Sequence, residues 1–277
     1  MRYDLYRKIG IKSKFIKIFH RFLQFFTKTK PIKWDNWIDK TYILHLSDRT
    51  DRFKLLNKEL SKIKTTTGKL SKKVIWFPGF RNKKDWNKKD FSPKYTFNYH
   101  HYVDPLPSPK GINSDLEIEC SIPESMCALG HLGMWRKFLD SNAEVACFLE
   151  DDIEFTYRYD KTITDIFEKE LPPDWDMVYL SSEPARYGFD FVEHSKNLFK
   201  VHKGLWWLSG YVLTRRAAKI LLDNLPITGP VDAWINHQLP KLNVFSAKNN
   251  VIYQSGKTPS DNFYSFREKG LDTVDET

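Results

Sequence analysis

The chain has 277 residues, of which 41% are hydrophobic and 15% aromatic, and this composition excludes an intrinsically disordered protein. Its formal charge of +9 comes from residues 1–33, which hold ten Lys or Arg and a single acid, Asp4. The other 244 residues hold 34 basic and 34 acidic side chains. A nucleic-acid-binding domain carries its basic residues on the folded body, so we expect no nucleic-acid partner.

Three cysteines, Cys120, Cys127 and Cys147, are too few for a disulfide framework, and the sequence has no Asn-x-Ser/Thr sequon. Both features fit a reducing compartment, so we expect a cytoplasmic protein. Basic residues interrupt every apolar stretch of the N-terminus, which argues against a signal peptide. No run of about 18 apolar residues predicts a transmembrane helix.

Residues 1–33 are predicted to form a separate amphipathic helix. Its apolar side chains recur three and four residues apart: Ile11, Phe15, Ile18, Phe22 and Phe25. Its basic side chains occupy much of the remainder: Lys12, Lys14, Lys17 and Arg21. Such a helix can lie on an anionic membrane surface, or it can pack its aromatic stripe onto the domain, and both interpretations stay open.

From residue 34 the sequence alternates short apolar runs with helical patterns. We expect one domain over residues 34–267, followed by a tail over 268–277. Strands are predicted at residues 41–47, 74–77, 143–149, 177–180, 204–213, 243–247 and 251–254. Helices are predicted at residues 51–64, 123–140, 163–171 and 214–225, with a long surface loop over 81–115. This order predicts an α/β fold with a mostly parallel central sheet.

An acidic run, Glu150-Asp151-Asp152, follows directly from an apolar strand. Three adjacent carboxylates repel one another unless a cation lies among them. Ligands of open α/β sheets bind beyond the carboxyl ends of strands, and carboxylate oxygens suit Mg²⁺ or Mn²⁺. The alternative is an acidic surface loop that caps the next helix.

A second strand-to-helix turn, residues 46–52, carries Arg49 and Arg52. Arginine donates paired hydrogen bonds to phosphate and stacks on bases, so this turn is a candidate nucleotide site. Ordinary capping by Asp48 or Asp51 explains the same residues.

Three further features are ambiguous on their own. His131, on a predicted helix, is typical of a structural histidine. Asp232, beside Trp234 after a turn, is either a surface acid or a catalytic one. Trp206 and Trp207 lie in an apolar run that is either core or a platform for a sugar.

Together and in this order, these segments resemble glycosyltransferase family 25, over residues 41–256. The matching segments are residues 43–52, 123–131, 147–152, 175–180, 210–221 and 230–232. Three positions depart from the family pattern: His45 replaces Asn, Met126 replaces Gly and Gly130 replaces Ser. The acidic run is intact, so an active enzyme is expected.

The resemblance implies a Rossmann-like domain of the GT-A type that binds a UDP-sugar. It implies that Mn²⁺, or Mg²⁺, is held by Asp152 and Glu150, with His237 as a late ligand. The nucleotide would contact two segments: the turn after the first strand, through Leu46, Arg49 and Arg52, and the acidic run, through Glu150 and Asp151. Galactose is the first expectation for the donor sugar and glucose the second.

The resemblance also implies inversion at the sugar, for which one base must deprotonate the acceptor hydroxyl. Asp232 is the first candidate for this base and Glu183 the second. The acceptor would be a glycan, a glycolipid or a protein, and residues 1–33 would hold the enzyme at a membrane surface. The competing hypothesis is a non-catalytic module that binds polyanions or membrane surfaces through its basic residues.

Overall fold

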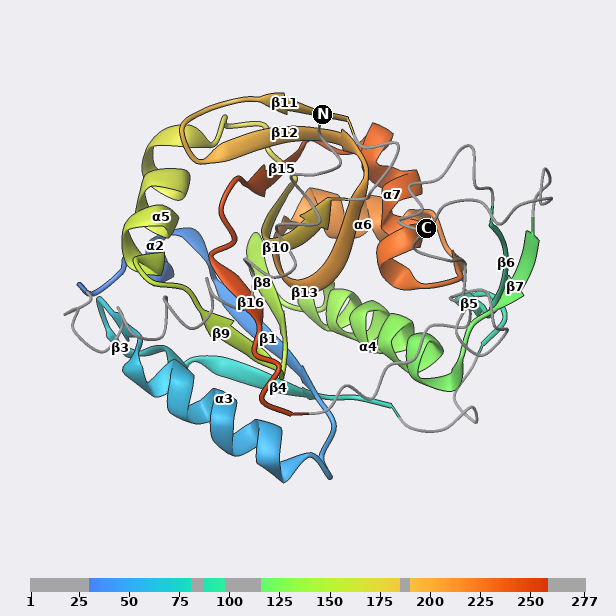
Figure 1. The fold of residues 1–277 in the computed structure, drawn as a ribbon, viewed down its shortest axis with the longest axis horizontal. Helices are drawn as coiled ribbons and strands as arrows, with labels where there is room; N and C mark the ends of the chain where they lie inside the picture. The colour runs from blue at the N-terminus through green and yellow to red at the C-terminus, as the bar shows by residue number, and fades with distance from the viewer. Residues whose placement is uncertain (1–29, 81–86, 98–115, 185–189, 259–277) are drawn as a thin grey trace, which may run out of the picture.

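The computed structural model describes residues 30–80, 87–97, 116–184 and 190–258. Most of the predicted N-terminal helix and all of the predicted tail lie outside them. An eight-stranded sheet runs through the centre of the described molecule (Figure 1). Its strands, in spatial order, are β11 (Asp190–Glu193), β12 (Leu198–Lys203), β15 (Val244–Ala247), β10 (Met177–Pro184), β13 (Leu205–Thr214), β8 (Val145–Glu150), β1 (Lys40–His45) and β4 (Val74–Pro78).

The sheet is mixed, with six of its eight strands pointing the same way. β1 is parallel to β4 and to β8, and β10 is parallel to β15. β13 runs antiparallel to both of its neighbours, and β12 runs antiparallel to both of its own. These two strands therefore point the same way as each other, and the chain passes from β12 to β13 through Gly204 alone.

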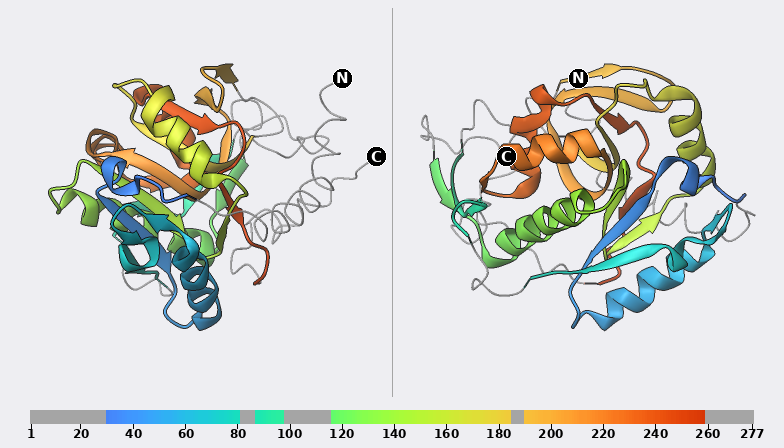
Figure 2. Two further views of the ribbon diagram at one scale, coloured as in Figure 1. Left: turned by 90° about the vertical axis from the view of Figure 1, so that its left-hand side faces the viewer. Right: turned by 180° about the vertical axis from the view of Figure 1, so that it is seen from behind.

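Helices cover both faces of the sheet, as Figures 1 and 2 show from opposite sides. One face packs against α4 (Ile122–Leu139), α6 (Arg215–Asp223) and α7 (Val231–Gln238), and the other against α2 (Trp34–Trp37), α3 (Thr50–Lys62) and α5 (Tyr159–Asp165). Strand side chains alternate between two cores, with Tyr42 and Phe148 in one and Ile43 and Leu149 in the other. Both faces are therefore apolar, which made the central strands visible as apolar runs.

Helix α4 begins with a capping box. The Ser121 hydroxyl accepts a hydrogen bond from the Glu124 backbone N–H, while the Glu124 carboxylate accepts one from the Ser121 N–H at 2.7 Å. This fixes the start of the helix within one residue of the predicted position. Further along α4, Cys127 and His131 are four residues apart and face the sheet edge described below.

Some elements differ from the predictions. The helix predicted at 163–171 is α5 followed by a π-helical turn, η3 (Ile166–Glu170). β11 (DFVE) and β12 (LFKVHK) were not predicted because both mix apolar residues with exposed charged ones and neither forms a continuous apolar run. Small two-stranded pairings join β9 (Ile153–Phe155) to β16 (Ile252–Gln254), β5 (Phe91–Ser92) to β14 (Ile227–Thr228), β6 (Lys94–Phe97) to β7 (Leu116–Glu119) and β2 (Lys64–Thr65) to β3 (Gly68–Lys69).

The folded body begins earlier than residue 34. Ile32 is 1% exposed, its N–H donates to Lys64 O at 2.9 Å, and Lys33 pairs with Glu168. At least residues 30–33 therefore belong to the domain. None of the described helices is long and apolar enough to cross a membrane.

Candidate functional site

The carboxyl ends of β1 and β8 lie side by side, because the strands are parallel and Leu44 pairs with Glu150. On the other side of β8, the first half of β13 reaches the same edge, since Gly210 pairs with Leu149. Helix α7 starts there as well: Asp232, in its first turn, accepts a hydrogen bond from the Trp207 N–H. The fold thus brings together the predicted acidic run and the predicted base.

The three carboxylates of the acidic run point to different partners. Asp151 is enclosed, with Oδ1 accepting from Arg52 at 2.9 Å and Oδ2 bonded to His45 Nδ1 at 2.8 Å. Its side chain is 5% exposed. Both of its oxygens are engaged within the protein, so Asp151 anchors the acidic loop to α3 and β1. That role differs from the predicted contact with the nucleotide.

Asp152 accepts fewer hydrogen bonds from the described residues than Asp151 does. Its Oδ1 is buried and has no hydrogen-bond partner among the described residues, and its Oδ2 lies 3.8 Å from the Arg52 guanidinium. Burial, followed by the charge of Glu150, raises the pKa of Asp152 to about 7. A buried carboxyl crowded by a second one is an arrangement that a cation would stabilise.

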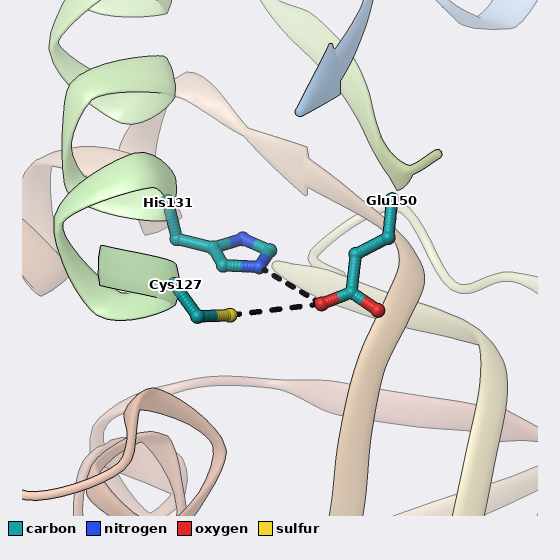
Figure 3. Close-up of side chains that lie close together, drawn as sticks. All are labelled: Cys127, His131 and Glu150. Carbon is teal, nitrogen blue, oxygen red and sulfur yellow. Dashed lines mark hydrogen bonds and ion pairs between the residues drawn. The ribbon is translucent and has the colours of Figure 1, made fainter. Parts of the chain in front are cut away.

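Glu150 faces α4 (Figure 3). Its Oε1 accepts a hydrogen bond from the Cys127 thiol at 3.6 Å and lies 3.8 Å from His131 Nε2. Burial acts to raise the pKa of Glu150, but hydrogen bonds and the neighbouring imidazole outweigh it, so the pKa is lowered. Among the described residues, Cys127, His131 and Glu150 form the group whose ligand-type atoms all lie within 4.8 Å of one another.

Asp232 is held by backbone donors at a strained part of β13. Its Oδ2 accepts from the Trp207 N–H at 3.3 Å and its Oδ1 from the Ala233 N–H at 2.9 Å. Trp207 has a φ of +72°, a conformation that bulky side chains rarely adopt, and it lies within a bulge of the β10–β13 pairing. Burial raises the pKa of Asp232 despite these hydrogen bonds. A carboxylate of raised pKa is a stronger base.

The remaining predicted residues lie around this centre. Arg49 is the N-cap residue of α3, where its guanidinium pairs with Asp51 at 3.0 Å. Arg49 itself makes no side-chain capping hydrogen bond, and the Asp51 carboxylate accepts one from the Arg52 backbone N–H in the first turn. Leu46 lies in the turn before Arg49, and its carbonyl accepts the Arg49 N–H.

Two predicted residues lie further along their elements. Glu183 is near the end of β10, opposite Trp206 in β13. His237 lies in the last turn of α7, and burial lowers its pKa. It is outside the group formed by Cys127, His131 and Glu150. The structure thus gathers Glu150, Asp152 and Asp232, and the role of His237 as a metal ligand stays a prediction.

Sequence reasoning missed three residues of the site. His131 was interpreted as structural, yet its Nε2 faces Glu150 and has no hydrogen-bond partner among the described residues. Ser209, in β13, is fully buried, and its hydroxyl lies close enough to Glu150 to help lower the pKa of that carboxylate. His45 holds Asp151. The spacing of Cys127 and His131 on one helix face was the signal for the first, the departure from the family pattern at position 45 was the signal for His45, and Ser209 carried none.

The sequence of the chain is similar to those of known proteins. The sequence model described as "Glycosyltransferase family 25 (LPS biosynthesis protein)" matches residues 38–235. The chain belongs to glycosyltransferase family 25. The match runs from β1, through the acidic run, to the first turns of α7.

Family 25 relatives include a "Glycosyltransferase 25 family member" of Anopheles gambiae. It is 25% identical over a stretch that covers 83% of this chain and 39% of the relative's length. "Procollagen galactosyltransferase 1-B" of Xenopus laevis is 31% identical over 40% of this chain and 19% of its own. "Procollagen galactosyltransferase 2" of Homo sapiens is 24% identical over 54% of this chain and 27% of its own. The chain therefore spans less than two fifths of the length of these relatives.

A solved structure, a UDP-glucose pyrophosphorylase complexed with UDP-glucose, is similar over 45% of this chain and 55% of its own. The identity is 11% and the TM-score 0.30.

Proposed function

We propose that this protein transfers a hexose from a UDP-sugar to a hydroxyl of a glycan, glycolipid or protein acceptor, on a fold of the GT-A type. Galactose is the first donor sugar we expect, because relatives of the chain are named galactosyltransferases, and glucose is the second. The observation that carries the proposal is Asp152. Its Oδ1 is buried and has no hydrogen-bond partner in the described part of the chain, and it lies beside Glu150 at the carboxyl end of a central strand.

The donor atoms at this strand end fit a hard divalent cation. Asp152 offers a carboxyl oxygen that no described residue hydrogen-bonds, Glu150 adds a second carboxyl whose pKa is lowered, and oxygen ligands suit Mn²⁺ and Mg²⁺. We infer that Asp152 and Glu150 hold the cation, with His237 as a predicted later ligand. When bound, the cation would neutralise charge on the leaving diphosphate.

The nucleotide is proposed to lie over the start of α3. Arg49, Arg52 and Leu46 border this region, and Arg52 already links α3 to the acidic loop through Asp151. A guanidinium at this position offers N–H donors to phosphate oxygens. Arg52 would then serve two roles: it holds Asp151 and contributes positive charge next to the donor.

Asp232 is the proposed general base. Its backbone donors fix the orientation of the carboxylate, and the raised pKa favours uptake of a proton from the acceptor hydroxyl. A single base of this kind suits one direct displacement, with inversion at the sugar. Glu183 is the second candidate, at the end of the neighbouring strand.

The test combines binding and turnover. Wild-type protein is mixed with Mn²⁺ and a panel of UDP-sugars, and donor hydrolysis and melting temperature are measured. A ligand at about 100 times its dissociation constant should stabilise the protein by about 2.7 kcal/mol. Asp152→Asn should lose the Mn²⁺-dependent shift, whereas the control Asp223→Asn, at an exposed ion pair, should keep it. An unchanged shift in Asp152→Asn contradicts the proposal.

The same assay separates binding from chemistry. Asp232→Asn should bind the UDP-sugar normally and lose transfer to an acceptor, by about 100-fold or more, as for a general base. NMR of the product gives the anomeric configuration directly. Retention of configuration would overturn the single-displacement proposal while leaving the donor site intact.

The location of the protein is a further part of the proposal. The three cysteines are unpaired, which fits the cytoplasm, and the basic segment of residues 1–33 would place the enzyme at an anionic membrane surface. The rival hypothesis, a non-catalytic polyanion-binding module, predicts a salt-sensitive thermal shift with polyanions and none with UDP-sugars.

A further inference from the structure

Three buried polar side chains, Trp135, Tyr211 and His131, form a line of contacts that leads to Glu150. The Trp135 indole Nε1 donates to the Tyr211 hydroxyl at 2.8 Å, and that hydroxyl is 2.7 Å from His131 Nδ1. The opposite ring nitrogen, His131 Nε2, faces Glu150 Oε1 at 3.8 Å (Figure 3). Trp135, Tyr211 and His131 are all fully buried. The line therefore runs from the core to the proposed donor site.

The donors and acceptors in this line fix where the histidine proton resides. Trp135 Nε1–H is only a donor, so the Tyr211 oxygen accepts from it. The phenolic proton of Tyr211 then needs an acceptor, and the recorded one is His131 Nδ1. With Nδ1 accepting, a neutral ring carries its proton on Nε2. The other tautomer would bury the Tyr211 proton without an acceptor, at a cost of about 1–3 kcal/mol.

We propose that His131 is a positioning residue: as its Nε2–H tautomer, set by Tyr211 and Trp135, it holds Glu150 in place for the donor-bound cation. The Nε2–H attracts Oε1 toward α4, and Figure 3 shows the second carboxylate oxygen directed away from that helix. The 3.8 Å separation is longer than a hydrogen bond, and catalytic contacts of this kind tighten when the ligand binds. The inference rests on the proposed role of Glu150 in donor binding.

The same three side chains have another interpretation, a transition-metal site. Thiol, imidazole and carboxylate suit Zn²⁺ better than Mn²⁺. Two features argue against it. Nε2, the nitrogen that a metal would need, carries the proton, and burial together with Glu150 raises the pKa of the Cys127 thiol well above its ordinary value. If the three side chains are joined by hydrogen bonds and hold no metal, His131 Nε2 and the Cys127 thiol both keep their protons.

The first experiment reads the tautomer directly. A long-range ¹H–¹⁵N correlation spectrum of the full chain shows which ring nitrogen of His131 is protonated; we expect Nε2–H. In Tyr211→Phe the preference should weaken, because the donor to Nδ1 is gone. A neutral Nδ1–H ring or an imidazolium in the wild type would overturn the proposal. This result is independent of whether the protein transfers a sugar.

The second experiment separates positioning from stability. In His131→Gln the amide nitrogen replaces Nε2 and can donate to Glu150, whereas in His131→Asn it replaces Nδ1 and cannot. Calorimetry with UDP should show Mn²⁺ affinity within about threefold of wild type for His131→Gln and about 10- to 100-fold weaker for His131→Asn. Equal losses in both variants that follow their melting temperatures would overturn the positioning role.

A cobalt titration decides the remaining alternative. If Co²⁺ produced a thiolate charge-transfer band that Cys127→Ser removed, the cluster would be a metal site and the proposal would fail. Absence of that band, together with the Nε2–H tautomer, supports it. If the protein bound no UDP at all, the proposed function would fail while the tautomer measurement still stood.

Discussion

The Asp152 carboxyl is weakly paired and lies beside a second carboxylate. The nearest described cation, Arg52, is 3.8 Å from Asp152 Oδ2 and donates its hydrogen bond to Asp151 instead. Burial and then the Glu150 charge raise the pKa of Asp152 to about 7. A divalent cation would favour the ionised form, so binding of Mn²⁺ near neutral pH should release a proton.

The raised pKa gives a pH dependence of stability with a definite sign. Folded, Asp152 keeps its proton up to about pH 7; unfolded, it ionises near its ordinary value of 3.8. The folded state binds more protons between these values, so this group's contribution is complete below pH 3.8 and is lost as the pH rises to about 7. Asp152→Asn should therefore gain stability over wild type as the pH rises, by on the order of 2–4 kcal/mol once the pH exceeds 7.

Urea denaturation without divalent cations, from acidic to mildly alkaline pH, measures this difference. Asp151→Asn is the control because its carboxylate pairs with Arg52 and His45. Removing one partner of a buried ion pair costs about 3–5 kcal/mol, so this neighbour should lose stability rather than gain it. A gap between wild type and Asp152→Asn that stayed constant with pH would contradict the pKa assignment.

At the scale of elements, two glycines let α4 approach the sheet closely. A Cβ at Gly130 would lie 2.6 and 2.7 Å from the two Cδ atoms of Leu44, and one at Gly133 would lie 2.7 Å from Phe77 Cζ. These glycines face β1 and β4, the strands that border the proposed nucleotide region. The Ser-to-Gly departure from the family pattern at position 130 therefore has a packing reason.

The Gly130–Leu44 contact predicts a coupling between two substitutions. Gly130→Ser should destabilise the protein by about 1–3 kcal/mol, because Leu44 must move. Leu44→Ala should remove the clash, so the double variant should be more stable than the sum of the two single effects by about 0.5–3 kcal/mol. Chemical denaturation of the four proteins measures this difference. Strictly additive losses would show that the contact does not limit how closely α4 packs.

Some elements could be predicted from the sequence alone. β1, β8, β10 and β13 were predictable because both of their faces are buried, which produces continuous apolar runs. The position of the acidic run followed from β8. The separate roles of its three carboxylates could not be predicted, because the partners of Glu150 and Asp151 come from α4, α3 and β1. Only the tertiary fold reveals which carboxylate keeps a free oxygen.

At the scale of the whole molecule, the basic segment of residues 1–33 overlaps the start of the described body at residues 30–33. The described body starts with a segment that is anchored to it: Lys30 N–H donates to Asp160 and Ile32 is buried in a core. The predicted boundary at residue 33 would cut through this anchor. A deletion that ends at residue 29, ahead of Lys30, keeps this anchor whole.

Two deletions that differ by four residues test this boundary and the role of the basic segment. Removing residues 1–29 should leave stability and donor hydrolysis unchanged and reduce binding to anionic vesicles. Removing residues 1–33 should in addition cost about 2–5 kcal/mol, because Ile32 leaves a core and Lys33 loses Glu168. Denaturation curves and vesicle sedimentation measure both effects.

A charge variant completes this test without shortening the chain. Replacing Lys12, Lys14, Lys17 and Arg21 by Gln should weaken vesicle binding, since each basic residue near an anionic surface contributes about 1 kcal/mol. Its melting temperature should match that of the wild type. If removing residues 1–29 instead lowered the melting temperature as much as removing 1–33, the segment would pack onto the domain, and the intramolecular interpretation of the aromatic stripe would hold.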